Sequence, residues 1–234
     1  MKERLGTICA RGGSKGVKNK NIRLISNRPL IAYTLAHAKE CGLFSAVAVT
    51  SDSDEILETA RNWGADFLIK RPPEMATDEA PKLPAIRHCV LEVEKQTKVH
   101  YSVIVDMDPT SPLRDLTDIQ AAVDLLETQK VSNVITGVAA RRSPYFNLVE
   151  VNDRGVASLS KPLAKPITRR QDSPRCFDMN ASIYVWQRAA LFDYPTVFNA
   201  DTRLFVMPEE RSTDIDNELD FEIVELLVQK RNSA

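Results

Sequence analysis

The chain has 234 residues, of which 43% are hydrophobic and 27% are charged, as in an ordinary globular protein with a substantial core. Its 31 basic and 32 acidic side chains leave a net charge of -1, which excludes general attraction to nucleic acid or an anionic membrane. No apolar stretch reaches the roughly 18 residues that a membrane span requires. The four cysteines form no CxxC pair, which argues against a zinc cluster or a disulfide framework. We therefore expect a cytoplasmic protein with reduced thiols and a local anion site.

Short apolar runs rich in β-branched residues alternate with longer amphipathic segments. This alternation predicts a mostly parallel α/β sheet with helices on both faces. Strands are expected at Leu5–Ala10, Ser45–Thr50, Ala65–Ile69, Tyr101–Met107, Val131–Val138, Ala181–Trp186 and Leu204–Met207. Helices are expected between Pro29 and Gly42 and over Ser53–Trp63, Pro84–Glu94 and Thr117–Thr128. We expect one domain over residues 1–234.

The segment 140–175 interrupts this alternation. Asn147–Val151 and Val156–Leu159 flank the sequence Asn-Asp-Arg-Gly, which predicts a β-hairpin, and a basic stretch with prolines follows. An arm that cannot bury itself on its own sheet favours packing on another subunit, so we expect a homodimer. The alternative is an ordinary surface hairpin.

A glycine-rich basic loop, Arg-Gly-Gly-Ser-Lys-Gly at residues 11–16, directly follows the first expected strand. Glycines let backbone N–H groups approach a ligand closely, and Arg11, Lys15 and Lys20 supply positive charge. The spacing fits neither a Walker motif nor a dinucleotide-binding fingerprint. We interpret the loop as a polyphosphate site, with a mobile basic turn as the alternative.

Two carboxylates, Asp214 and Asp216, lie close together near the carboxyl end of the chain. In an extended segment they point the same way, so they are suited to holding a Mg²⁺ ion that bridges nucleotide phosphates. An amphipathic helix is expected next, with apolar positions at Leu219, Ile223, Leu226 and Leu227. The alternative is that Asp216 is only the N-cap of that helix.

Five motifs follow one another along the chain. They are Arg11–Gly16 with Lys20-Asn21, Arg71-Pro72 ahead of Asp78, Pro109–Arg114, Asn180–Tyr184, and Asp214-Ile215-Asp216. In this order they resemble the bacterial CMP-sialic acid synthetase family over nearly the whole chain, and in particular its legionaminic acid branch.

The resemblance implies a twisted, Rossmann-like three-layer nucleotidyltransferase fold with a β-hairpin dimerisation arm. It implies that the anomeric hydroxyl of a nonulosonic acid attacks the α-phosphorus of CTP, releasing pyrophosphate and a CMP-nonulosonate such as CMP-legionaminic acid. N-Acetylneuraminic acid is the alternative substrate, and the Arg11 loop and arginine-rich arm disfavour a Kdo-type synthetase. The intact Arg11, Lys20, Asp214 and Asp216 disfavour a non-catalytic nucleotide-sensing module.

The resemblance also implies roles for single positions on the nucleotide side. Arg11 and Lys20 would neutralise the phosphates and act catalytically together with Asp216, in its metal pair with Asp214. The same nucleotide-binding loop contains Gly12, Gly13, Ser14 and Lys15. The cytosine would be framed by Asn21, Arg71 and Ala80. For Arg71 the alternative is a surface arginine before a proline turn.

On the sugar side, the resemblance implies that basic residues of the dimer arm bind the sugar carboxylate, which makes the active site shared between subunits. These arm residues are Arg169, Arg170 and Gln171, and the other expected sugar-binding residues are Asp108, Thr110, Ser111 and Asn180. The alternative is that residues 161–175 are a solvated basic strip.

Two positions depart from the family pattern. Sialic acid synthetases commonly carry glutamine where this chain has Asp108. A carboxylate accepts hydrogen bonds but cannot donate them, so we expect a different sugar contact, consistent with a 5,7-diamino nonulosonate such as legionaminate. The alternative is that Asp108 joins the metal shell at a strand end. Ala181-Ser182 stands where the family often has Gly-Ala, which is expected to reshape the sugar pocket.

Overall fold

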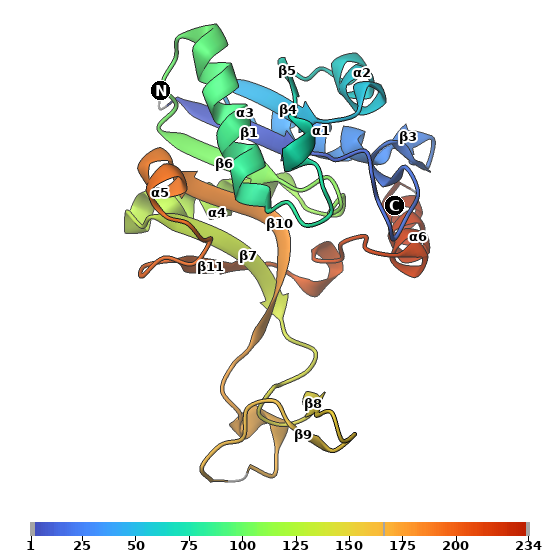
Figure 1. The fold of residues 1–234 in the computed structure, drawn as a ribbon, viewed down its shortest axis with the longest axis vertical. Coiled ribbons are helices and arrows are strands. Elements are labelled where there is room, and N and C mark those ends of the chain that lie inside the picture. Colours follow the sequence, from blue (N-terminus) through green and yellow to red (C-terminus); the bar gives the residue numbers. More distant parts are fainter. Residues whose placement is uncertain (1–2, 166, 233–234) are drawn as a thin grey trace.

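A twisted sheet of seven strands forms the centre of the protein, in the order β11-β7-β10-β6-β1-β4-β5 (Figure 1). The structure, a computed structural model, describes residues 3–165 and 167–232. The strands are β1 (Arg4–Cys9), β4 (Ala46–Ser51), β5 (Phe67–Lys70), β6 (Val103–Met107), β7 (Asn133–Ala139), β10 (Phe177–Gln187) and β11 (Arg203–Val206). β10 runs antiparallel to both of its neighbours, and the other pairs are parallel. The mostly parallel sheet is therefore confirmed, and each expected strand forms.

Helices cover both faces of the sheet. They are α1 (Leu30–Glu40), α2 (Asp54–Asn62), α3 (Lys82–Thr97), α4 (Leu116–Gln129), α5 (Arg188–Asp193) and α6 (Glu218–Asn232). Side-chain caps fix two of the starts, because Ser53 accepts a hydrogen bond from Ile56 N–H and Asp115 forms a capping box with Asp118. Short pieces complete the chain: η1 (Lys20–Ile22), β2 (Leu24–Ile25), β3 (Arg28–Pro29), η2 (Pro73–Met75), η3 (Arg170–Asp172) and η4 (Glu209–Arg211).

Successive side chains of the buried strands pack alternately into two apolar cores, one on each face of the sheet. In β1, Ile8 joins the core formed with α1, α2 and α4, whereas Leu5 joins the core formed with α3 and α5. Burial of both faces explains why these strands read as continuous apolar runs in the sequence. None of the helices in residues 3–165 and 167–232 has the length and apolar character of a bilayer-spanning segment.

Helix α6 buries a different face from the one that the sequence predicted. Phe221, Val224 and Val228 are at most 4% exposed and pack in a third cluster with Val17 and Ile215. The positions expected on the buried face are mostly exposed: Leu219 is 64% exposed, Ile223 42% and Leu226 53%, while Leu227 is partly buried. The prediction of the face was wrong because the helix is apolar on two stripes, and tertiary contacts decide which stripe is buried.

A hairpin arm projects away from the sheet through β7 and β10 (Figure 1). Its strands β8 (Val149–Val151) and β9 (Ala157–Leu159) pair antiparallel, which confirms the predicted hairpin. Asn152 Oδ1 closes the turn by accepting hydrogen bonds from two backbone N–H groups, and Gly155 has the positive φ of 78° that the turn needs. Apolar side chains of the hairpin stay exposed within this chain, among them Val149, Val151 and Val156.

His37 on α1 is expected to make the fold sensitive to acid. Burial, followed by the positive charges of Arg114 and Arg28, lowers the pKa of His37 to about 3. A histidine in an unfolded chain titrates at about pH 6.5, so below that pH the unfolded state binds a proton that the folded state does not. Stability is therefore lost as the pH falls from about 6.5 toward 3, by at most about 1.4 kcal/mol per pH unit.

The substitution His37→Gln removes this titration and leaves the other groups unchanged. Between about pH 7 and pH 5, the unfolding free energy of the wild type should fall by about 1 to 2 kcal/mol more than that of the variant. Urea unfolding at the two pH values measures the difference. Equal losses in both proteins would show that His37 takes up its proton in the folded state.

Candidate active site

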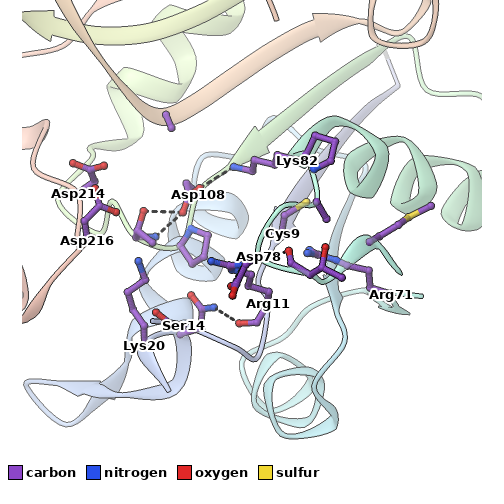
Figure 2. A pocket seen from close by; sticks show the side chains of 18 residues that line it. Cys9, Arg11, Ser14, Lys20, Arg71, Asp78, Lys82, Asp108, Asp214 and Asp216 are labelled. Carbon is purple, nitrogen blue, oxygen red and sulfur yellow. Dashed lines mark hydrogen bonds and ion pairs between the residues drawn. The ribbon is translucent and has the colours of Figure 1, made fainter. Parts of the chain in front are cut away.

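A cavity of about 380 Å³ opens at the carboxyl ends of β1 and β6 (Figure 2). The chain passes from β1 outward to β4 and β5 and then returns to place β6 on the other side of β1. This reversal of strand order splays the connections apart, and ligands of open α/β sheets bind at such a point. Residues from several of the sequence motifs meet here, including Arg11, Arg71, Asp108, Ala181 and Asp216.

The basic loop and the acidic segment lie against each other, although they belong to opposite ends of the sequence. The Lys20 ammonium donates a hydrogen bond of 2.5 Å to the carbonyl of Ile215. A Cβ on Gly16 would lie 1.8 Å from the Asp216 carbonyl oxygen, so only glycine permits this approach. Ile215 is fully buried, and its N–H donates to the carbonyl of Thr110. The segment is therefore fixed from both sides, with its two carboxylates in the cavity.

Asp216 is not the cap of α6, so that alternative reading was wrong. Asn217 Oδ1 accepts a hydrogen bond from Asp220 N–H at 3.0 Å, and the Asp220 carboxylate accepts from the N–H groups of Asn217 and Asp216. This reciprocal arrangement satisfies the start of the helix without the Asp216 side chain. The Asp216 carboxylate is left to line the cavity beside Asp214.

The Asp214–Asp216 pair has the properties of a site for a hard cation. Burial, followed by the negative charge of Asp216, raises the pKa of Asp214 to about 6. A bound divalent cation would relieve this repulsion through carboxylate oxygens, which are the ligands that Mg²⁺ prefers. Among the described residues, no group of three or more histidine, cysteine or acidic side chains forms a metal cluster. The pair therefore fits an ion that would take its remaining ligands from outside the protein.

The cations of the loop are held by Asp78. Arg11 Nη1 lies 2.7 Å from Asp78 Oδ1, and Lys15 Nζ lies 2.6 Å from Asp78 Oδ2. All three side chains are more than a third exposed, so these ion pairs contribute little to stability and exchange readily with another anion. The interpretation of the loop as a polyphosphate site agrees with this arrangement, because a triphosphate can replace one exposed carboxylate.

The glycines of the loop differ in what they contact. Gly12 N–H donates to Asp52 Oδ1 at 2.9 Å, so this N–H is already engaged in the described structure. Gly13 has open space where a Cβ would stand, and Ser14 lines the cavity. The nucleotide-binding roles of Gly12 and Gly13 stay predictions.

The three residues expected to frame the cytosine all line the cavity. Arg71 is only 6% exposed and donates to the Thr50 carbonyl at 3.0 Å, so the alternative of a surface arginine was wrong. Asn21 donates to the carbonyl of Arg11, and its own side-chain oxygen is buried without a hydrogen-bond partner among the described residues. Ala80 contributes to the same wall. An unpartnered buried amide oxygen is suited to accepting a hydrogen bond from an amino group of a ligand.

Asp108 is paired with Lys82, a residue for which the sequence suggested no role. Lys82 Nζ lies 2.8 Å from Asp108 Oδ2, as Figure 2 shows. It also lies 2.7 Å from Asp106 Oδ2. The other oxygen of Asp108 accepts hydrogen bonds from the N–H and hydroxyl of Thr110. Burial alone would raise the pKa of Asp108, but the charge and hydrogen bonds of Lys82 and Thr110 lower it to about 2. Asp108 is therefore a fixed carboxylate with a cation beside it.

The remaining expected sugar residues differ in their access to the cavity. Thr110 lines it, whereas Ser111 is fully buried outside the lining. Asn180 is 4% exposed, and its amide contacts Thr136, Ser182 N–H and Met207 Sδ, so it supports the irregular part of β10. The sugar-binding roles of Ser111 and Asn180 stay predictions.

The arginines of the arm do not reach the cavity of their own chain. Arg169 pairs with Asp172, and Arg170 donates to the carbonyl of Ala140 at 2.6 Å. Arg170 lines a separate hollow of about 180 Å³ at the base of the arm, together with Arg142 and Arg175. Gln171 is the middle residue of η3, directly after Arg170. Within one chain these basic side chains are therefore apart from the acidic pair and the basic loop of the cavity.

Comparisons with known proteins agree with this geometry. A family model described as cytidylyltransferase matches residues 5–230. The chain belongs to the cytidylyltransferase family. It is 45% identical over 99% of its length to the CMP-N,N'-diacetyllegionaminic acid synthase of Campylobacter jejuni subsp. jejuni, covering 97% of that protein. It is 44% identical, with the same coverage of both chains, to the post-translational flagellin modification protein B of Campylobacter coli.

The fold also agrees with a solved cytidylyltransferase structure. CMP:2-keto-3-deoxy-manno-octonic acid synthetase complexed with CTP superposes with a TM-score of 0.71 and 17% identity, covering 98% of this chain and 99% of that one. At this identity the likeness concerns the fold, and it confirms the expected Rossmann-like nucleotidyltransferase architecture. Cytidylyltransferases of this kind generally use a divalent metal.

The contact between Gly16 and the acidic segment leads to a prediction. Gly16→Ala should lower the unfolding free energy by about 1 to 3 kcal/mol, because the methyl group forces the loop away from Asp216. Turnover of CTP should fall with it, since the loop cations and the carboxylates separate. Chemical denaturation and pyrophosphate release measure the two effects.

Gly13→Ala is the matched control for stability, because a methyl group there meets no atom of the described part of the chain within 4 Å. It should change the unfolding free energy by no more than about 0.5 kcal/mol. If Gly16→Ala is as stable and as active as the wild type, the close contact between the loop and Asp216 does not exist in solution.

Proposed function

We propose that this cytidylyltransferase couples CTP to a nonulosonic acid, specifically a legionaminic acid, and releases CMP-legionaminate and pyrophosphate. The proposal is supported by the similarity to the Campylobacter jejuni synthase and by Asp108 in the cavity. The observation that carries the proposal is the Lys20–Ile215 hydrogen bond, which brings the basic loop and the Asp214–Asp216 pair together. CTP, the proposed substrate, is a cytoplasmic metabolite, so we place the activity in the cytoplasm.

The side chains of the cavity are suited to phosphoryl transfer. The attacking sugar hydroxyl forms a new bond to the α-phosphorus while the bond to pyrophosphate breaks, and negative charge builds up on the phosphate oxygens. Arg11 and Lys20 offset that charge from one side, and Asn21, Arg71 and Ala80 hold the cytosine so that the α-phosphorus is presented to the sugar. The protein thus contributes positioning and electrostatics.

Asp214 and Asp216 would hold the metal ion, which we propose to be Mg²⁺. A bound Mg²⁺ supplies Lewis-acid stabilisation to the phosphate oxygens. The chain provides two carboxylates on the same side of an extended segment, with the buried Ile215 pointing the other way. This arrangement leaves the remaining coordination positions for the triphosphate and water.

Pyrophosphate release from CTP, measured with a panel of nonulosonic acids with and without Mg²⁺, tests the function. We expect Mg²⁺-dependent release with legionaminic acid and much less with N-acetylneuraminic acid. Release with N-acetylneuraminic acid alone would make the protein a CMP-N-acetylneuraminic acid synthetase. CTP binding without release under any sugar would make it a nucleotide-sensing module.

Asp216→Asn tests the metal pair. It should lower kcat by about 100-fold or more, because a transition-state contact is lost, while CTP still binds to the loop and the cytosine residues. Asp124→Asn, on the exposed side of α4, is the matched control and should keep full turnover. Turnover of Asp216→Asn at the wild-type rate would remove Asp216 from the metal site.

We further propose that the arm of residues 140–175 joins two chains into a homodimer and brings Arg169, Arg170 and Gln171 to the partner's cavity. The support is geometric: the arm leaves Val149, Val151 and Val156 exposed, and its arginines are separated from the cavity of their own chain. Apolar side chains of this kind on a projecting hairpin are suited to an interface between copies. A guanidinium group binds a carboxylate through two hydrogen bonds, as the sugar requires.

Mixing two inactive variants tests the shared site. Asp216→Asn damages the cavity, and Arg170→Ala damages the arm, so each homodimer should have little activity. After co-refolding, random pairing gives one intact site in half of the dimers, and about a quarter of the wild-type activity should return. No recovery from a mixture that contains heterodimers would show that each chain uses its own arm.

A further inference from the structure

Lys82 occupies an unusual place for a basic residue. It is the first residue of α3, where the helix dipole disfavours positive charge. Its ammonium lies between the carboxylates of Asp106 and Asp108, at 2.7 Å and 2.8 Å, and 5.4 Å from the centre of the Tyr184 ring. Tyr184 is in turn stacked on Trp186, which fixes that wall. Three interactions therefore hold the ammonium against the unfavourable helix end.

The two carboxylates beside Lys82 differ in their surroundings. Asp106 is fully buried, and its other oxygen accepts a hydrogen bond from Thr7, so a cation beside it satisfies a charge that water cannot reach. Asp108 is 19% exposed and lines the cavity, as does Lys82, which is 31% exposed. The Lys82–Asp106 pair is therefore buried within the protein, whereas the Lys82–Asp108 pair faces the cavity.

The exposed pair presents a donor and an acceptor side by side. The ammonium has three N–H groups: among the described residues one donates to Asp108 Oδ2, and Asp106 Oδ2 lies beside it as an ion pair at 2.7 Å, which leaves donor capacity for a ligand. Asp108 Oδ2 receives one hydrogen bond from Lys82 and has a further lone pair. Asp108 alone could only accept, so Lys82 restores the donor that a carboxylate lacks.

The charge of this cluster decides which ligand group fits. The Lys82 ammonium is flanked by two carboxylates, so its positive charge is already compensated and the cluster offers a phosphate or a sugar carboxylate no free cation. A neutral group that both donates and accepts, such as an acylamino substituent beside a hydroxyl, needs no such cation. Figure 2 shows Lys82 and Asp108 across the cavity from Arg11 and Ser14. Ala181, at the root of the arm, lines the same cavity with a positive φ of 51°.

We propose that Lys82 is a specificity-determining residue for the sugar, whose ammonium donates a hydrogen bond to an acylamino carbonyl beside the acceptor oxygen of Asp108. This inference rests on the proposed function, because it assigns a role within the same reaction. The substrate class that it selects is a nonulosonic acid with acylamino groups, in preference to one with hydroxyl groups at the same carbons.

The double variant Asp106→Asn/Lys82→Met tests this role without leaving the fully buried carboxylate of Asp106 unpaired, while Asp108, which is 19% exposed, keeps its hydrogen bonds from Thr110. Methionine keeps the unbranched stem of the lysine, and the amide at position 106 can still accept from Thr7. The KM for a 5,7-diacylamino nonulosonic acid should rise about tenfold, which corresponds to about 1.4 kcal/mol, while the KM for CTP changes less than about twofold. Asp106→Asn alone retains the Lys82–Asp108 pair and should keep both KM values near those of the wild type.

An unchanged KM for the sugar in the folded double variant would make Lys82 only a structural counter-ion and would overturn the proposal. An equal rise in the KM for CTP would overturn it as well, because the pair would then serve the nucleotide. Folding is checked by thermal unfolding of both variants.

A second measurement requires only the wild-type protein. We expect kcat/KM to be at least about tenfold higher for the diacylamino sugar than for its analogue with hydroxyl groups, and equal values would overturn the proposal. If the wild type releases no pyrophosphate with any nonulosonic acid, the proposed function fails, and the role of Lys82 fails with it. Turnover by the wild type with no discrimination contradicts the role of Lys82 alone.

Discussion

The contact between the two ends of the sequence is the constraint on which the site depends. Lys20 and Ile215, 195 positions apart, are joined by a hydrogen bond from an ammonium to a backbone carbonyl. Gly16 allows the loop to approach the Asp216 carbonyl, and the buried Ile215 turns its two acidic neighbours toward the cavity. Without this contact, the cations proposed to bind phosphate and the carboxylates that suit a metal would not face the same cavity.

Charged groups in the cavity are used in different ways according to their burial. Arg11 and Lys15 pair with the exposed Asp78, and such pairs exchange readily because water screens them. Lys82 is fixed between Asp106 and Asp108, where a missing partner would leave a buried charge uncompensated. The exposed cations are therefore available to a triphosphate. The fixed Lys82–Asp108 pair is instead suited to hydrogen-bonding a neutral group.

The sequence predicted the parts of the fold that depend on local pattern. Buried parallel strands read as β-branched runs. The loop at Arg11 and the pair at Asp214 could be singled out because their residue types and spacing suggest a chemistry, and the structure brings both to one cavity. Lys82 was missed because a lysine at a helix start has no sequence signature, and only the tertiary fold brings it to Asp108. The buried face of α6 was missed because it depends on contacts with distant segments. The cap at Asn217 is local, since Asn217 and Asp220 have the spacing of a capping box, and that spacing could have predicted it.

The most direct test is a crystal structure of the protein with CTP and Mg²⁺. The triphosphate should lie between Arg11 and Lys20 on one side and Asp214 and Asp216 on the other, with the ion on the two carboxylates and the cytosine beside Arg71. A triphosphate bound away from the basic loop, or an ion bound away from Asp214 and Asp216, would contradict the account of the site.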